Sequence, residues 1–190
     1  MAVDMSDAAL APGAVARRGP RLWRCRGRDG RLYTIRSMTP ADAPALVQAY
    51  AEQDADDRLS RMLAALPRLP MPLARRLCTV DETRDVALAL FADDEPHRLC
   101  GGARLMRDGD GDAAEFAVSV ASRLQGAGLG RLALETALSV GPEIGVRRVW
   151  GTILRSNAPM RGLARKLGMS ERRDPDDRML IIAEKTLAPA

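Results

Sequence analysis

Residues 123–131 read Arg-Leu-Gln-Gly-Ala-Gly-Leu-Gly-Arg, with glycine at every second position from 126 to 130. The stretch follows an apolar run, residues 113–121, and leads into residues 129–139, whose apolar positions have the spacing of a helix. Glycine is unfavourable inside regular structure and is used where the backbone turns sharply or approaches another group closely. The start of a helix also presents unpaired N–H groups and the positive end of the helix dipole. The stretch therefore predicts a strand-to-helix junction that holds a phosphate group.

Two common phosphate-binding motifs do not fit this junction. A dinucleotide-binding motif needs G-x-G-x-x-G, whereas Arg131 stands at the last position and the glycines follow G-x-G-x-G. A Walker loop needs G-x-x-x-x-G-K-[ST], which the sequence does not contain. The pattern that remains is Gln125-x-x-Gly128-x-Gly130.

The composition is that of one ordinary globular domain. The chain has 190 residues, of which 46% are hydrophobic and 28% charged. No apolar stretch approaches the 18 or so residues of a membrane-spanning helix, so we expect no membrane partner. The three cysteines are scattered and form no C-x-x-C pair, which argues against a disulfide framework and favours a cytoplasmic protein.

The sequence also argues against a metal site. There is one histidine, so no histidine cluster is possible. Residues 108–112 read Asp-Gly-Asp-Gly-Asp, but a calcium-binding EF-hand loop needs Gly at its sixth position and Glu at its twelfth. Ala113 and Ser119 stand there, so we expect a hairpin turn and no metal.

The N-terminal part is rich in arginine. Seven arginines fall between residues 17 and 31, a density that would suit nucleic acid or an acidic partner. However, only two of the 29 basic residues of the chain are lysines, so the arginines reflect the composition of the whole chain. We expect residues 1–26 to form a disordered Arg/Ala/Pro-rich leader and residues 27–190 to form the domain.

The remaining sequence alternates between two hydrophobic periods. Short apolar runs predict strands at residues 31–36, 85–91, 99–106, 113–121, 146–154 and 178–183. Helical signals predict helices starting at Thr39 or Asp42, at residues 59–66, 72–78 and 129–139, and from Ser156 or Asn157 to Gly168. This order predicts an α/β fold with a mixed sheet (α+β), and not a doubly wound parallel sheet.

With these elements in place, residues 113–169 resemble the GNAT superfamily of N-acetyltransferases. The family carries Arg/Gln-x-x-Gly-x-Gly/Ala at this strand-to-helix junction. Residues 27–169 look closest to the acetyltransferase domain of bacterial Pat-type protein lysine acetyltransferases, through RDGRLYTIRSMTPADAP, VDETRDVALAL, GGARL, AEFAVSV with QGAGLG, and LRSNAPMRGLARKLGM. The resemblance implies the GNAT acyl-CoA N-acyltransferase fold, a mostly antiparallel twisted sheet flanked by helices, with acetyl-CoA as cosubstrate.

The resemblance also implies which residues bind acetyl-CoA. Backbone N–H groups of the glycine loop would hold the pyrophosphate, the backbone of the preceding strand would pair with the pantetheine arm, and the start of the next helix would lie beside it. The residues concerned are Val118, Val120, Gln125, Gly126, Ala127, Gly128, Leu129, Gly130, Arg131, Asn157 and Met160. By their residue types alone, Asn157 also reads as a helix cap, and Met160 could equally fill a gap in the core.

Glu115 is the candidate general base. A carboxylate beside the thioester could take the proton of the attacking amine, directly or through a water. Glu115 lies in an otherwise apolar strand and shares a face with Ala117 and Ser119, whose small side chains leave room for a substrate. A solvent-facing glutamate after a turn would look the same, but the resemblance implies the catalytic role. We expect this carboxylate to be partly buried.

The sequence departs from the family in its general acid. Many members carry a tyrosine in the penultimate helix that protonates the leaving thiolate, and the matching position here is Ala164. The two tyrosines, Tyr33 and Tyr50, lie far away in the sequence. We therefore expect water or the proton of the substrate amine to serve instead.

These observations predict an acetyl-CoA-dependent N-acetyltransferase that modifies lysine side chains of a protein by direct transfer. The resemblance suggests an acyl-CoA synthetase as the acceptor. Two alternatives stay open: acetylation of a small-molecule amine or a protein N-terminus, and a non-catalytic sensor that binds acyl-CoA without turnover. Binding of nucleic acid through the arginine-rich leader is a weaker alternative, and the sequence leaves the oligomeric state undetermined.

Overall fold

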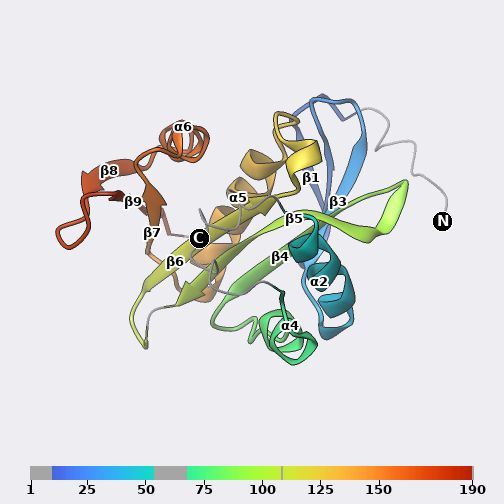
Figure 1. Cartoon of the computed structure of the whole chain (residues 1–190), viewed down its shortest axis with the longest axis horizontal. Helices are drawn as coiled ribbons and strands as arrows, with labels where there is room; N and C mark the ends of the chain where they lie inside the picture. Colours follow the sequence, from blue (N-terminus) through green and yellow to red (C-terminus); the bar gives the residue numbers. More distant parts are fainter. Residues whose placement is uncertain (1–9, 54–67, 108, 190) are drawn as a thin grey trace.

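A computed structural model of the protein describes residues 10–53, 68–107 and 109–189. Within these residues, nine strands form one sheet in the order β1-β2-β3-β4-β5-β6-β7-β9-β8 (Figure 1). All neighbouring strands are antiparallel except β6 and β7, which run parallel. This confirms the predicted mixed sheet. The strands are β1 (Val15–Gly19), β2 (Leu22–Arg26), β3 (Leu32–Ser37), β4 (Val86–Ala92), β5 (Glu95–Arg107), β6 (Ala113–Val120), β7 (Arg148–Leu154), β8 (Ser170–Arg173) and β9 (Leu180–Thr186).

Helices cover both faces of the sheet. Alternate residues of β4 show the arrangement, because side chains of a strand point alternately to opposite faces. Leu88 and Leu90 belong to the main core, which is shared with α5 (Leu129–Val140), whereas Ala89 and Phe91 belong to a second core shared with α2 (Ala43–Ala51) and α4 (Met71–Cys78). The sheet is therefore the middle of three layers (Figure 1). The helices are η1 (Pro40–Asp42), α2 (Ala43–Ala51), α4 (Met71–Cys78), η2 (Ser122–Leu124), α5 (Leu129–Val140), η3 (Gly141–Ile144) and α6 (Ala158–Lys166).

The helix start predicted at Thr39 or Asp42 uses both residues. The Asp42 carboxylate accepts hydrogen bonds from the N–H of Thr39 at 2.8 Å and from its hydroxyl at 3.1 Å, which closes the short 3₁₀ helix η1. Asp42 is also the N-cap of α2, so Pro44 lies in the first turn, where its missing N–H breaks no helical bond. The same carboxylate accepts two hydrogen bonds from Arg36 of β3 at 2.7 and 2.8 Å, which ties the helix start to the sheet.

The prediction of a disordered leader over residues 1–26 is wrong for its second half. Residues 15–26 form β1 and β2, which extend the sheet beyond β3. Trp23 and Cys25 of β2 point into the main core and are 4% and 0% exposed. Burial of a tryptophan gives this segment enough apolar surface to order it. Trp23 and Cys25 alternate with arginines, which is typical of a strand with one buried face, but the high arginine content favoured a disordered leader. Residues 1–9 lie outside the described residues.

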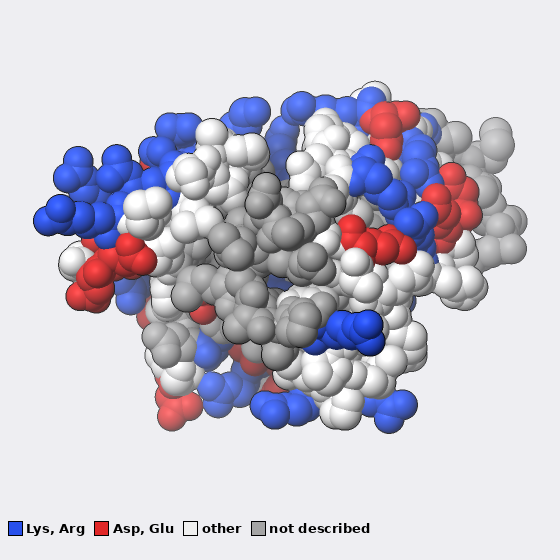
Figure 2. Space-filling view, in the orientation of Figure 1, with Lys and Arg blue, Asp and Glu red and all other residues white. Residues whose placement is uncertain are grey.

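Several arginines of this region have carboxylate partners within the protein. Arg17 pairs with Glu143 at 2.9 Å, Arg24 donates to Asp93 at 2.6 Å, and Arg31 pairs with Asp94 at 2.5 Å. Blue and red side chains accordingly lie beside one another on the visible face (Figure 2). This partial neutralisation weakens the case for a nucleic-acid surface.

The structure confirms the other predicted strands and four of the predicted helices, with ends shifted by a few residues. The largest shift is in β5, which begins at Glu95 where we predicted residue 99. The short strand β8 was not predicted, because its polar residues, Ser-Glu-Arg-Arg, show no apolar alternation. Residues 109–112 form the expected turn, and the predicted helix at 59–66 lies outside the described residues. None of the described helices has the length and apolar character needed to cross a membrane.

Candidate active site

The centre of the sheet opens where β6 and β7 part. Their parallel pairing joins Ala113–Glu115 to Arg148–Trp150 and ends at Glu115 and Trp150. Beyond this point β6 stays paired with β5, and β7 stays paired with β9. Among the described strands, none therefore covers the β7-facing edge of β6 from Phe116 onward. Val118 and Val120 lie on this stretch, where peptide groups can pair with an extended ligand.

The glycine loop follows at the end of β6. The chain passes through η2 and enters the loop at Gln125, and Gly126 and Gly128 both have positive φ, +87° and +80°. These left-handed conformations favour glycine, because a Cβ would approach the next carbonyl oxygen. A Cβ built at Gly126 would meet no atom within 4 Å, so there is open space beside the loop. The sharp turn predicted from the sequence is confirmed.

The start of α5 presents donors toward this loop. Its first helical hydrogen bond runs from the N–H of Leu132 to the carbonyl of Gly128 at 3.2 Å. The N–H groups of Leu129, Gly130 and Arg131 precede this bond and have no helical carbonyl to donate to. They lie at the positive end of a 12-residue helix. This arrangement fits a phosphate group, and the backbone of the loop would hold it.

Side chains near the loop have partners within the protein. The guanidinium of Arg131 pairs with Glu135 at 3.3 Å, so this residue can offer its backbone N–H to an anion. Val118, Val120 and Met160 pack against the main core. A Cβ at Gly130 would be 3.5 Å from Val120 Cγ2, an ordinary contact, so Gly130 brings α5 close to β6 without demanding glycine.

Asn157 caps α6. Its Oδ1 accepts a hydrogen bond from the N–H of Met160 at 3.0 Å, and Pro159 occupies the first turn. This confirms the cap that the sequence predicts. The parts assigned to Asn157, Gln125 and Ala127 in cosubstrate binding stay predictions. The carbonyl of Ala127 accepts a hydrogen bond from the N–H of Arg28 at 2.9 Å, which ties the glycine loop to the turn between β2 and β3.

Glu115 is exposed on the face of β6 opposite the main core. It alternates with the buried Ala114 and Phe116 and shares its face with Ala117 and Ser119, as predicted. The expected partial burial is wrong, because Glu115 is exposed although its cross-strand neighbours are Met106 of β5 and Trp150 of β7. An exposed carboxylate at this point is accessible to an incoming amine.

Arg104, which was not predicted from the sequence, lies on the same face of the sheet as Glu115. Arg104 of β5 pairs in register with Ala117. Its guanidinium donates to the carbonyl of Leu77 at 2.7 Å, and burial under α4 lowers its pKa. Within the described parts of the chain it has no carboxylate partner. An arginine inside the apolar run Gly-Gly-Ala-Arg-Leu-Met was the available signal.

Neither tyrosine stands in the helix where the family places its general acid. Ala164 of α6 is fully buried in the main core. The Tyr33 hydroxyl donates to Asp29 at 2.5 Å, and burial together with this carboxylate raises its pKa. Tyr50 lies in the second core beside α4. That water or the proton of the substrate amine protonates the leaving thiolate stays a prediction.

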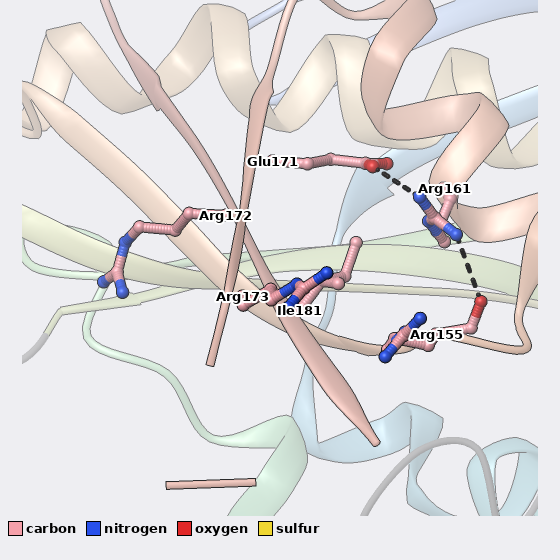
Figure 3. Close-up of a pocket in the computed structure, with 6 residues that line it drawn as sticks. All are labelled: Arg155, Arg161, Glu171, Arg172, Arg173 and Ile181. Carbon is pink, nitrogen blue, oxygen red and sulfur yellow. Dashed lines mark hydrogen bonds and ion pairs between the residues drawn. The ribbon is translucent and has the colours of Figure 1, made fainter. Parts of the chain in front are cut away.

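A separate cavity of about 270 Å³ lies at the far end of the sheet (Figure 3). Arg161 of α6 pairs there with Glu171 of β8 at 2.8 Å and donates to the carbonyl of Arg155 at 3.2 Å. None of these residues was selected from the sequence. The full lining comprises Arg155, Arg161, Glu171, Arg172, Arg173 and Ile181. Elsewhere too, the described residues bring together no group of three or more histidine, cysteine or acidic side chains that could hold a metal.

Comparison with known proteins agrees with this geometry. A family model described as an acetyltransferase (GNAT) domain matches residues 33–170. An acetyltransferase of Pseudomonas aeruginosa is 28% identical over 155 residues, which are 81% of this chain and 83% of that protein. The crystal structure of the GNAT domain of S. lividans PAT superimposes with a TM-score of 0.81 at 26% identity, covering 90% of this chain and 100% of that one.

A more distant likeness concerns the fold alone. The acetyltransferase of the GNAT family from Streptococcus pneumoniae gives a TM-score of 0.68 at 19% identity, covering 82% of this chain and 99% of that one. The family match runs from β3 to β8 and contains both the parting of β6 from β7 and the glycine loop at the start of α5. The chain therefore belongs to the GNAT family of acetyltransferases, whose cosubstrate is acetyl-CoA.

Proposed function

We propose that this GNAT acyltransferase acetylates lysine side chains of a protein, with Glu115 as the general base. The observation that carries the proposal is the exposed Glu115 carboxylate at the residue where the pairing of β6 and β7 ends. The resemblance to Pat-type enzymes, together with the likeness to the whole GNAT domain of S. lividans PAT, supports a protein lysine as the acceptor. The same resemblance suggests that the acceptor protein is an acyl-CoA synthetase.

Deprotonation of the amine is the first task of the site. A lysine ammonium has a pKa near 10.4, so removal of its proton at neutral pH costs about 4–5 kcal/mol. The Glu115 carboxylate would accept this proton, directly or through one water, once the amine lies beside it. Ala117 and Ser119 leave space for the acceptor side chain on this face of β6.

The backbone would orient the second substrate. Acetyl-CoA, when bound, supplies an acetyl group activated as a thioester. The uncovered edge of β6 offers peptide groups for the pantetheine amides and N–H donors that would polarise the thioester carbonyl. The loop from Gly126 to Gly130 would hold the pyrophosphate through its N–H groups. Since a thiol has a pKa near 8.5, its thiolate can leave without a dedicated tyrosine acid.

The test compares wild type with Glu115→Gln, which removes the base and keeps the shape of the side chain. We expect the wild-type protein to transfer acetyl groups to a bacterial acetyl-CoA synthetase, measured as free thiol and as acetyl-lysine on the acceptor. The variant should lose about a hundredfold or more in kcat, the size typical of a general base. Its affinity for acetyl-CoA should stay unchanged, because the cosubstrate contacts lie elsewhere on β6 and α5.

Glu82→Gln is the matched control, because Glu82 is an exposed glutamate in the loop before β4. Equal rates in wild type and Glu115→Gln would remove Glu115 from the mechanism. Acetylation of small amines or of peptide N-termini, without acetylation of the synthetase, would favour the first alternative acceptor class. Binding of acetyl-CoA without turnover on any amine would favour the non-catalytic sensor.

A further inference from the structure

We propose that the Arg28 side chain binds the pyrophosphate of acetyl-CoA, and so completes the glycine loop with a charged group from outside it. This inference rests on the proposed binding of acetyl-CoA by the loop. Arg28 lies in the turn between β2 and β3, a part of the chain that precedes the matched family region, residues 33–170.

The position of Arg28 is set by its backbone. Its N–H donates to the carbonyl of Ala127 at 2.9 Å, which fixes the turn against the glycine loop. Its side chain then lies over Gly128: a Cβ built at Gly128 would be 3.4 Å from both Cγ and Nε of Arg28. The side chain of Arg28 therefore lies at Gly128, the N-cap residue of α5, and the first N–H groups of this helix belong to Leu129 and Gly130.

The charges around the loop leave Arg28 available for a ligand. Arg131 pairs with Glu135 at 3.3 Å, and Arg123 pairs with Glu95 at 3.2 Å. Arg28 is exposed and, among the described residues, has no ion pair.

The neighbouring acid is already engaged within the turn. Asp29 accepts hydrogen bonds from the Tyr33 hydroxyl at 2.5 Å and from the N–H of Arg31 at 3.2 Å. Its carboxylate therefore has partners on the inner side of the turn, while Arg28 extends over the loop.

The chemistry of the two groups is complementary. A pyrophosphate diester carries two negative charges, and the N–H groups of a helix start supply only partial positive charge. A guanidinium adds a full charge and a planar set of donors that matches phosphate oxygens. Arg28 would thus supply the charged side chain that the loop, built from Gly, Ala and Leu at positions 126–130, does not contain.

The test measures acetyl-CoA binding by calorimetry for wild type, Arg28→Ala and Arg28→Lys. We expect Arg28→Ala to weaken binding about tenfold or more, the effect of losing a charged hydrogen bond to phosphate. Arg28→Lys should recover part of this loss, because it keeps the charge without the planar donor set. Arg148→Ala is the matched control, since Arg148 is an exposed arginine at the opposite end of β6, beside Ala113.

Three further measurements test whether Arg28 contacts the pyrophosphate. Arg28→Ala should weaken the binding of dephospho-CoA, which lacks the 3′-phosphate, by the same factor as the binding of CoA. Weaker binding of CoA alone would assign Arg28 to the 3′-phosphate and overturn the pyrophosphate assignment. The KM for acetyl-CoA should rise while kcat stays nearly constant. Thermal unfolding of Arg28→Ala should match wild type, because the backbone bond to Ala127 remains.

Failure of the inference and failure of the proposed function give different results. Wild-type binding retained in full by Arg28→Ala overturns the role of Arg28 and leaves the loop as the cosubstrate site. Absence of acetyl-CoA binding by wild type overturns the proposed function and the role of Arg28 together.

Discussion

At the scale of single residues, Gly128 and Gly130 are two positions apart but face different demands. Gly128 has φ of +80°, a conformation that costs an alanine about 1–2 kcal/mol. Gly130 lies in the first turn of α5 with ordinary contact distances of 3.5–4.0 Å for an added Cβ. The backbone conformation therefore requires glycine at Gly128, whereas the space around Gly130 admits an alanine.

We expect Gly128→Ala to lower the free energy of unfolding by about 1–2 kcal/mol and to weaken acetyl-CoA binding, because the loop must distort. Gly130→Ala should be neutral or stabilising by up to about 1 kcal/mol, since alanine is the better helix former. Urea unfolding of the two variants, followed by circular dichroism, measures the difference. Equal destabilisation by both variants would show that contacts around the loop, and not its backbone conformation, require the glycines.

At the scale of elements, the hairpin of β1 and β2 is part of the domain, and its two strands contribute unequally. β1 is largely exposed, whereas β2 buries Trp23 and Cys25 in the main core. We expect a chain that starts at residue 20, which lacks β1, to fold with a modest loss of stability. A chain that starts at residue 27 lacks both strands and should melt at least about 10 °C lower or fail to fold, because loss of a buried tryptophan alone costs about 3–5 kcal/mol.

The truncations are compared by thermal unfolding. Retention of the full melting temperature by the chain that starts at residue 27 would contradict a structural role for the hairpin. It would also agree with the prediction of a disordered leader over residues 1–26. The burial of Trp23 and Cys25 therefore predicts that removal of residues 1–26 lowers the stability of the domain.

At the scale of the whole molecule, the three cysteines are reporters of folding. All are free and buried, and burial raises the pKa of each thiol, that of Cys25 to about 12. Since the thiolate is the reactive form, we expect the native protein to react with a thiol reagent in far less than one equivalent over minutes. The protein unfolded in guanidinium should react at all three cysteines. Fast reaction of any cysteine in the native protein would show that the core opens locally on that timescale.

The fold class and the main features of the candidate site could be predicted from the order of residues alone. The change from a period of two to a period of 3.6 located most strands and helices, because apolar burial dominates folding. The alternating glycines predicted the turn at Gly126 and Gly128, because only glycine adopts positive φ without penalty. The sequence singles out Glu115 because it is a charged residue inside an apolar strand, where charged residues are uncommon.

Which distant groups meet at these features depends on how the whole chain folds. Glu115 stands at the last residue pair before β7 leaves β6, and this relation between residues 115 and 150 is contained in no local pattern. The contact of Arg28 with Gly128 joins turns about a hundred residues apart. The order of residues 15–26 likewise depends on burial of Trp23 in a core built from the rest of the chain. Local periodicity reports what each segment prefers, whereas burial and pairing between segments depend on the complete sheet.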